Sequence, residues 1–460
     1  MLTGGMNVRN RRDWLKCVAA TLGSVPLTTS SRASEVDQGR KKSKELTITD
    51  VRITPIALPD PPLLNAAGVH GPYFLRHIIE IETDAGVTGV GETHGGAALT
   101  TQLAQARLLV IGRSAMAYRE WAPLLLKLGT NVYAGFEVAC LDAVGHALNC
   151  RVCDLLGGPV RNEVEFASYL FYRYAADHPQ VFTDPYLVDD RGTGGNAIDE
   201  WGEVRTPEAM AELAWKFQQR FGFRAHKLKA GVLDPALELE TMHRMHERLG
   251  DGHRLRIDPN GRWTMKTALR IGQQLHELPL EYYEDPVAGQ EAMAEVRQLT
   301  QLPISTNSCV TRFAHIPSAV SLKPIDIVLA DHHMWGGLSA CVTLGTISET
   351  LGWGVSQHSN NHTGVSMAAM IHLGATVPQM NYASDTHYVW LPDGTDIIEG
   401  EKLEIRDGKM KLPDGPGLGV TLDRDRLAKA HEVYQKSGMR RRNDGTTMQR
   451  FEPGWERTLY

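Results

Sequence analysis

The second half of the chain carries acidic, basic and amide side chains at nearly regular intervals. In chain order these are Lys227 with Lys229, Asp258, Glu284, Asn307, Asp331 and His358. From Lys229 onward the intervals are 29, 26, 23, 24 and 27 residues. Each interval has room for one strand, one helix and two loops, so each group is predicted to end a strand. Side chains of these types bind metal ions and transfer protons.

Short apolar runs lead up to these groups and are typical of buried parallel strands. The runs are Ala225–Lys229, Leu255–Asp258, Leu280–Glu284, Pro303–Asn307, Ile325–Asp331 and Gly354–His358. In a (β/α) barrel the C-terminal strand ends converge on one cavity, so side chains far apart in sequence become neighbours. The predicted fold class is therefore α/β, with a TIM-like barrel that carries the chemistry.

Three oxygen donors on consecutive predicted strands, Asp258, Glu284 and Asn307, form the candidate metal site. This hard-ligand set suits Mg²⁺, with water and substrate completing an octahedron. Taken singly, each residue would be interpreted as a helix cap or a turn residue. Their regular spacing on three successive strands favours the metal site.

Lys227 and Lys229 are two residues apart on one predicted strand, so both side chains face the barrel mouth. Two ammonium groups at this distance, partly desolvated and near a metal ion, are expected to depress at least one lysine pKa and so provide a base near neutral pH. The alternative is an ordinary pair of surface lysines at a strand edge.

His358 lies on the next-to-last barrel strand and Asp331 on the strand before it. This placement predicts a dyad in which the carboxylate fixes the imidazole tautomer and raises its basicity. A lone histidine on a barrel strand is more often structural, and the aspartate partner favours the catalytic interpretation. The lysine pair and His358 are expected to approach the cavity from opposite sides.

A divalent metal between two such bases suits proton abstraction next to a carboxylate. The carbon acid is weak, so the enediolate must be stabilised by Mg²⁺ and cationic side chains as it forms. Loss of a β-hydroxyl then completes a dehydration, whereas return of the proton on the other face gives epimerisation. Metal-dependent hydrolysis on a barrel would instead require a His-x-His pair on the first strand, which the sequence lacks.

Four segments are predicted along the chain: a leader over 1–45, a capping domain over 46–162, the barrel over 163–395, and a C-terminal segment over 396–460 that packs back on the capping domain. The capping domain is expected to contain an antiparallel meander of Thr47–Leu58, His77–Thr83 and Val87–Glu92, turning at Asp84-Ala85-Gly86. In the C-terminal segment, Ile397–Leu412 is predicted as a hairpin turning at Asp407-Gly408, and Arg424–Lys436 as a helix.

The leader resembles a twin-arginine export signal. Arg11-Arg12 precedes an apolar stretch from Cys17 to Leu27, and Ser31-Arg32-Ala33 offers a cleavage site. Export to the periplasm is therefore expected; the alternative is a basic leader on a cytoplasmic protein. The expected partner is a small molecule.

Composition excludes several other classes of protein. The 460 residues are 42% hydrophobic and 22% charged, with a net charge of −6, which argues against nucleic-acid binding. No apolar run approaches about 18 residues, so no stable membrane association is expected. Cys150 and Cys153 form a CxxC within a predicted helix, Val138–Leu156, and without a second pair they indicate helix packing rather than a metal or redox site.

Several motifs closely resemble the glucarate dehydratase family, in the mandelate racemase branch of the enolase superfamily. The matching motifs are Lys227–Val232, Arg256–Gly261, Tyr283–Pro286, Thr306-Asn307 and His358-Ser359-Asn360-Asn361-His362. The resemblance covers nearly everything after Thr47. It implies a modified (β/α)₇β barrel with an N-terminal α+β capping domain, and a homo-oligomer.

The resemblance also implies residue roles. Lys227 would contact the substrate carboxylate, Lys229 would be one base, and His358, oriented by Asp331, would be the other base and the acid for hydroxide loss. Further implied substrate contacts are His70, Tyr169, Asn260, Ser359, Asn360, His387 and Arg442. The expected enzyme is a Mg²⁺-dependent hydro-lyase converting D-glucarate to 5-dehydro-4-deoxy-D-glucarate.

Two departures from the family pattern bear on specificity. The stretch between Leu126 and Glu137 is shorter than the family's, which predicts an altered lid over the far end of the substrate. Arg173-Tyr174 is also atypical. Alternatives are therefore dehydration or epimerisation of another aldarate or aldonate, or a non-catalytic paralogue that binds without turnover.

Overall fold

The computed structural model describes residues 46–180 and 199–460 of the chain. The export leader predicted over 1–45 lies outside the described residues and stays a prediction. Within the described ranges, no helix has both the length and the apolar character needed to cross a membrane.

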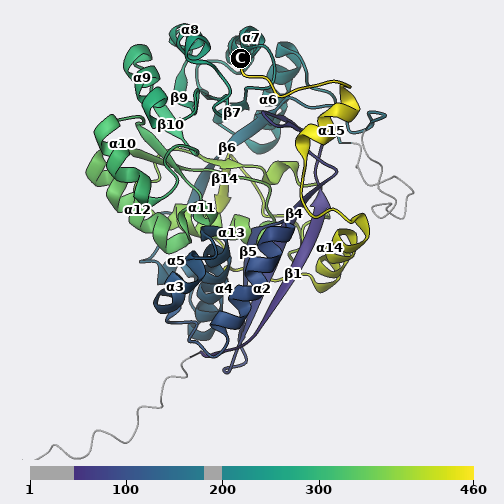
Figure 1. Cartoon of the computed structure of the whole chain (residues 1–460), viewed down its shortest axis with the longest axis vertical. Coiled ribbons are helices and arrows are strands. Elements are labelled where there is room, and N and C mark those ends of the chain that lie inside the picture. Colours follow the sequence, from purple (N-terminus) through teal and green to yellow (C-terminus); the bar gives the residue numbers. More distant parts are fainter. Residues whose placement is uncertain (1–45, 181–198) are drawn as a thin grey trace, which may run out of the picture. The chain divides into compact units, whose positions relative to one another are not determined.

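The capping sheet has three antiparallel strands in the order β1-β4-β5, as the sequence predicted (Figure 1). Its strands are β1 (Ile48–Pro59), β4 (Tyr73–Thr83) and β5 (Thr88–His94). The turn between β4 and β5 contains the predicted Asp84-Ala85-Gly86. Nearly every residue of β4 is buried, because helices cover one face of the sheet and the barrel and C-terminal segment cover the other.

Four helices follow: α2 (Ala97–Val110), α3 (Tyr118–Leu126), α4 (Thr130–Leu148) and α5 (Val152–Leu155). The helix predicted over Val138–Leu156 is interrupted, since Asn149 ends α4 in a left-handed conformation. Cys150 and Cys153 are free thiols. Only Lys127, Leu128 and Gly129 connect α3 to α4, at the place where the sequence predicted a shortened lid.

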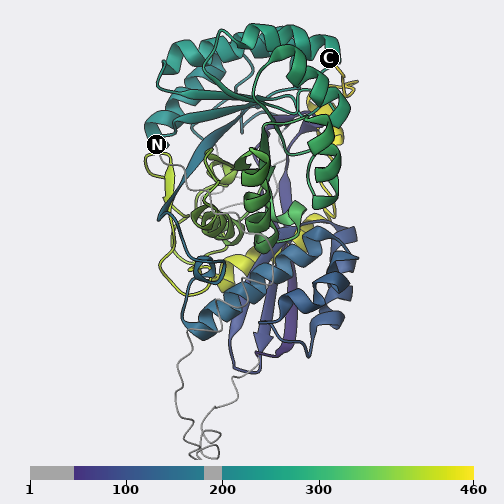
Figure 2. The same cartoon turned by 90° about the vertical axis from the view of Figure 1, so that its left-hand side faces the viewer.

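Eight parallel strands form the barrel in the order β12-β11-β10-β9-β8-β7-β6-β13 (Figure 2). They are β6 (Glu163–Phe171), β7 (Ala225–Lys229), β8 (Arg254–Asp258), β9 (Leu280–Glu284), β10 (Ile304–Thr306), β11 (Ile327–Ala330), β12 (Gly354–Gln357) and β13 (Ser384–Thr386). The helices between them are α6 (Pro207–Phe221), α7 (Pro235–Leu249), α8 (Met265–Leu275), α9 (Gln290–Thr300), α10 (Ile316–Leu322), α11 (His332–Trp335), α12 (Leu338–Leu351) and α13 (Gly364–Thr376). This is the predicted modified barrel.

The ring of strands closes between β12 and β13, the two ends of the paired order. Val355 forms an isolated parallel bridge with Met380. The Ser356 hydroxyl donates to the Ala383 carbonyl at 2.8 Å, and the Gln357 amide donates to the Ser384 hydroxyl at 3.0 Å. Side-chain hydrogen bonds therefore join β12 to the segment of β13, where the regular strand pairing stops.

The C-terminal segment partly differs from its prediction. The turn at Asp407-Gly408 is present and Arg406 forms an antiparallel bridge with Lys409 across it. The pairing does not extend over Ile397–Leu412, because β14 (Lys409–Lys411) pairs antiparallel with β6 of the barrel. The predicted helix is present as α14 (Arg424–Ser437), followed by α15 (Asp444–Phe451). Val433 and Tyr434 of α14 pack on Tyr73 and Leu75 of the capping sheet, and Figure 1 shows α14 beside β1. The C-terminal tail thus completes the capping domain.

Close packing of β5 on α4 depends on glycine. A Cβ atom at Gly89 would lie 2.1 Å from the Ala139 carbonyl oxygen and 2.6 Å from the Ala143 amide nitrogen. We expect Gly89→Ala to force the strand and helix apart and to lower the free energy of unfolding by roughly 1–3 kcal/mol. Urea denaturation measures this change.

Gly252 is the matched control, because nothing lies within 4 Å of its added Cβ and its φ is not positive. Gly252→Ala should leave the free energy of unfolding within about 0.5 kcal/mol of the unsubstituted protein. Equal stability of the two variants would contradict the packing argument.

Candidate active site

Strand register brings the predicted groups together at the C-terminal end of the barrel. Lys227 pairs in register with Tyr169 of β6, and Lys229 pairs with Asp258 of β8. Glu284 ends β9, while Asn307, Asp331 and His358 each follow the last residue of their strand. The barrel therefore positions the groups as the sequence spacing predicted.

Lys227 lies at the centre of a buried charge cluster. Its Nζ is 2.7 Å from Asp385 Oδ2, 2.6 Å from Glu284 Oε2 and 3.4 Å from Asp258 Oδ2. The ammonium also lies over the Tyr169 ring, 4.6 Å from its centroid. Its side chain is fully buried, so in this arrangement Lys227 balances the carboxylates.

Lys229 is the lysine that reaches the cavity, since 8% of its side chain is exposed compared with none of Lys227. Its Nζ donates to Asp258 Oδ2 at 2.6 Å. Burial by itself would lower the pKa of each lysine, but Asp385 and Glu284 beside Lys227, and Asp258 beside Lys229, raise both pKa values above their usual range. For the protein side chains alone, the carboxylates therefore outweigh the repulsion between the two ammonium groups, and the depressed lysine pKa expected beside a metal ion stays a prediction.

The candidate metal ligands are buried, and one oxygen of Glu284 lacks a partner. Asp258 and Glu284 are fully buried and Asn307 is 6% exposed. Glu284 Oε2 is paired with the Lys227 ammonium at 2.6 Å, while Oε1 is buried without a hydrogen-bond partner. Burial, together with the neighbouring Asp258 carboxylate, raises the pKa of Glu284 well above its usual range. Two adjacent buried carboxylates with an amide oxygen beside them fit a hard divalent cation such as Mg²⁺.

Asp285 supports the metal site from behind. Its carboxylate accepts the Asn307 backbone N–H at 2.9 Å and the Thr306 hydroxyl at 2.5 Å. These bonds fix the end of β10, where the Asn307 side chain begins. The sequence interpretation assigned Asp285 no role, although it stands directly after Glu284.

The predicted dyad is present. His358 Nδ1 lies 2.9 Å from Asp331 Oδ2. Burial opposes ionisation of Asp331, but hydrogen bonds from His333 and His358 outweigh it and hold the pKa of Asp331 well below its usual range. Because the ionised carboxylate can only accept, the Nδ1–H of His358 donates to it, which in the neutral ring leaves the lone pair on Nε2. Nε2 is therefore available to take a proton.

The lysine and histidine strands lie across the barrel from each other. In the ring of strands, β7 and β12 are separated by β6 and β13 on one side and by four strands on the other. The His358 side chain is 9% exposed, similar to Lys229. A small substrate at the mouth can therefore meet a basic group from two directions.

Aromatic side chains form one wall of the site. His387 lies 4.8 Å from the rings of Tyr169 and Phe171 and is stacked on His70 at 6.0 Å between ring centroids. Both ring nitrogens of His387 are buried without a hydrogen-bond partner. An unsatisfied buried imidazole of this kind is suited to a polar ligand. The three predicted contacts His70, Tyr169 and His387 are thus brought together.

Of the three consecutive arginines 440–442, Arg442 faces the site. Its Nη1 donates to Asp60 Oδ2 at 3.1 Å and to Asn361 Oδ1 at 3.0 Å, and Asn361 belongs to the loop after His358. Arg440 instead donates to carbonyls of its own segment. The sequence interpretation assigned no role to Asp60 or Asn361, because neither stands at a predicted strand end.

The remaining predicted contacts lie on loops beside the strand ends. The Asn260 backbone N–H donates to Asp258 Oδ1 at 2.9 Å, and Asn260 has a left-handed φ of 56°. Ser359 Oγ accepts the His387 backbone N–H at 3.0 Å. Asn360 is exposed at the outer edge of its loop. These positions border the cavity, and their contacts with substrate stay predictions.

Comparison with known proteins agrees with this fold. Residues 50–157 match the mandelate racemase/muconate lactonizing enzyme N-terminal domain, and residues 209–426 match the enolase C-terminal domain-like family. A probable glucarate dehydratase from Streptomyces coelicolor is 41% identical over 440 residues, covering 90% of this chain and 98% of that protein.

Solved structures give the same result. An enolase from Thermobispora bispora, complexed with magnesium and formate, is 40% identical, with a TM-score of 0.82 over 89% of this chain and 98% of that one. An enolase from Pseudomonas fluorescens, with bound magnesium, potassium and tartrate, is 40% identical, with a TM-score of 0.84 over 90% and 99%. The chain belongs to the mandelate racemase/muconate lactonizing enzyme branch of the enolase superfamily, among its glucarate dehydratase-like members.

Removing one candidate ligand tests the metal site. We expect Mg²⁺ to raise the Tm of the unsubstituted protein, because a ligand that binds only the folded state stabilises it by about 2.7 kcal/mol at one hundred times its Kd. Glu284→Gln should lose this effect and still fold, since glutamine keeps the shape and one oxygen acceptor, and the Lys227 ammonium keeps its carboxylate partners Asp258 and Asp385. Thermal unfolding across a Mg²⁺ titration measures the difference.

Glu277 is an exposed glutamate in the turn before β9. The control variant Glu277→Gln should keep the full Mg²⁺ response. A response of the same size in Glu284→Gln would place the cation elsewhere.

Proposed function

We propose that this chain is a Mg²⁺-dependent acid-sugar dehydratase. It removes the proton next to a substrate carboxylate and then eliminates water from the neighbouring carbon. D-Glucarate is the leading substrate, and 5-dehydro-4-deoxy-D-glucarate is the product. The similarity to the probable glucarate dehydratase supports this choice of acid.

The observation that carries the proposal is the His358–Asp331 dyad facing Lys229 across a mouth lined by Asp258, Glu284 and Asn307. Bound to these three oxygen donors, Mg²⁺ would stabilise the negative charge of an enediolate as a Lewis acid. Their burial keeps bulk water away from the developing charge, which strengthens electrostatic stabilisation.

His358 is suited to begin the reaction. Its Nε2 lone pair takes the C5 proton, and the resulting imidazolium is stabilised by Asp331 at Nδ1. The C4–O bond then breaks, and Nε2–H returns the proton to the departing hydroxide, which leaves as water. Tautomerisation of the enol gives the 5-keto product, so one substrate yields one keto acid and one water.

Lys229 faces the substrate from the other side of the ring as an ammonium group. Its hydrogen bond to Asp258 orients Nζ. In that form it donates a proton to the opposite face of the enediolate, and its neutral form accepts one. This second group allows proton exchange on both faces, the chemistry of epimerisation, which is the first alternative activity.

The three-residue connection between α3 and α4 supports a second alternative, dehydration of a different aldarate or aldonate. A shorter capping segment would change the contacts to the far end of the acid while leaving the dyad and the metal ligands in place. A non-catalytic paralogue is the third alternative; the retained Lys229 and His358 argue against it.

The test is a panel of aldarates and aldonates incubated with purified protein and Mg²⁺. Keto-acid formation and solvent-deuterium incorporation are read together. We expect turnover of D-glucarate, and a loss of roughly 10²- to 10⁴-fold in kcat for Lys229→Ala and His358→Ala, since each removes a proton-transfer group. Lys266→Ala, at an exposed position on α8, should leave kcat unchanged.

Turnover of another acid would favour the altered-lid alternative, and exchange without keto acid would favour epimerisation. A panel without turnover or exchange, for a protein that still binds Mg²⁺, would contradict the dehydratase proposal.

A further inference from the structure

The carboxylate of Asp331 serves two imidazoles. Its Oδ2 pairs with His358, while its Oδ1 accepts the His333 backbone N–H at 2.9 Å and lies 3.2 Å from His333 Nδ1. The plane of the carboxylate is fixed because each oxygen is held by its own partner. The orientation of the proposed base therefore depends on a second histidine behind it.

Arg76 of the capping sheet determines the proton position on His333. Its Nη2 lies 3.1 Å from His333 Nε2. A guanidinium group only donates hydrogen bonds, so Nε2 must accept and the ring proton must sit on Nδ1, pointing at Asp331. The Glu92 carbonyl and the Ser366 hydroxyl each lie 3.3 Å from the same nitrogen. A ring protonated on Nε2 could donate to either of them, but its N–H would then oppose the Arg76 guanidinium, which can only donate.

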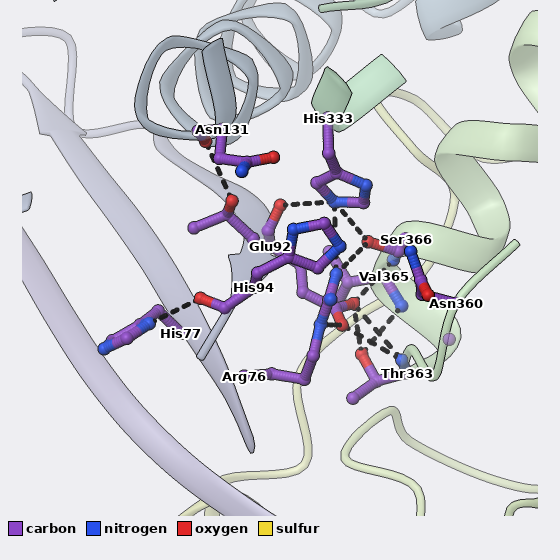
Figure 3. A network of polar contacts seen from close by, with 12 residues as sticks. Arg76, His77, Glu92, His94, Asn131, His333, Asn360, Thr363, Val365 and Ser366 are labelled. Carbon is purple, nitrogen blue, oxygen red and sulfur yellow. Dashed lines mark hydrogen bonds and ion pairs between the residues drawn. The ribbon is translucent and has the colours of Figure 1, made fainter. Parts of the chain in front are cut away.

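Glu92 holds Arg76 in place and also holds the loop of His358. Arg76 Nε donates to Glu92 Oε1 at 2.6 Å, and both side chains are buried. The same carboxylate accepts the Thr363 hydroxyl at 2.7 Å and the Ser366 backbone N–H at 2.8 Å, in the first turn of α13. Figure 3 shows this network between the sheet and the barrel.

The buried Arg76–Glu92 ion pair is thus connected to the proposed base in two ways. Arg76 contacts His333, which contacts Asp331. Glu92 contacts the start of α13, which follows the His358 loop. Among the described residues, three further histidines lie around His333: His94, 4.8 Å away between ring centroids, His332 at 3.9 Å, and the buried His362 of the His358 loop.

Asp331, His332 and His333 could also be considered as metal ligands, because one potential ligand atom from each lies within 4.8 Å of the others. However, both oxygens of Asp331 already accept hydrogen bonds. The geometry is therefore that of a hydrogen-bond relay.

We propose that His333 is a positioning residue for the His358 base, and that the Arg76–Glu92 pair of the capping domain sets its tautomer. The inference rests on the proposed function for its kinetic consequence. Its structural content, a neutral His333 protonated on Nδ1, is independent of any activity.

Three substitutions separate the two ends of the His333 ring. Asparagine places its amide nitrogen near the position of Nδ1 and keeps a donor for Asp331. Glutamine reaches the position of Nε2 and keeps a partner for Arg76, but loses the donor to Asp331. Leucine fills the space and keeps neither.

The kinetic test compares deuterium exchange at C5 of D-glucarate and of its C5 epimer. The two epimers present this hydrogen on opposite faces, and loss of exchange in His358→Ala or Lys229→Ala assigns each epimer to one base. We expect His333→Leu and His333→Gln to slow exchange on the His358 face by roughly tenfold or more. Exchange on the Lys229 face should change by less than about twofold, and His333→Asn should recover most of the lost rate.

His77→Gln is the matched control. His77 is the next residue of β4 after Arg76 and points away from the barrel, contacting the His94 carbonyl at 2.7 Å and the Thr100 hydroxyl at 2.8 Å. It should leave exchange on both faces unchanged. Equal loss on both faces in His333→Leu would show a merely structural role and would overturn the proposal.

Nitrogen-15 NMR of histidine-labelled protein tests the tautomer directly. The chain has 18 histidines, and the signals that disappear in His333→Asn belong to His333. We expect a neutral ring with Nδ1 protonated and Nε2 bare. Protonation on Nε2, or on both nitrogens, would overturn the proposal. Absence of exchange in the unsubstituted protein would instead contradict the proposed function and leave this NMR result to decide the relay.

Discussion

Two ammonium groups and three carboxylates share a space at the barrel mouth that water barely reaches. Lys227, Lys229, Asp258, Glu284 and Asp385 come from four different strands. Buried charges are tolerated only when opposite partners are close and well oriented, and loss of one partner leaves an uncompensated charge. The strands must therefore keep their register for the site to exist. Fold stability and site geometry depend on the same pairing.

The sequence allowed the barrel and its chemistry to be predicted, because each apolar run stops at a polar group. The bounds of β7 and β9 match the prediction residue for residue, and the third metal donor and the dyad stand directly after their strands. The lysine pKa could not be predicted from local spacing. The carboxylate that most raises the pKa of Lys227 is that of Asp385, 158 positions away on the last strand. Only closure of the barrel brings these two side chains together.

Long-range partners explain the other differences. The turn signal at Asp407-Gly408 was correct locally, but Lys409–Lys411 pairs with β6, far away in sequence. Arg76 and Glu92 looked like ordinary polar positions of an antiparallel sheet, where one face commonly meets water. Their partners lie on α11 and α13. No periodicity in the sequence distinguishes a polar residue facing solvent from one facing another domain.

The order of synthesis has a consequence for how the capping sheet forms. Strand β1 is made early, yet α14, which covers the apolar face beside it, and Arg442, which holds Asp60 from 382 positions away, are made near the end of translation. Until then the sheet exposes an unprotected edge and apolar side chains such as Tyr73, the kind of surface that favours aggregation. The nascent chain therefore carries this incompletely covered sheet for most of its synthesis.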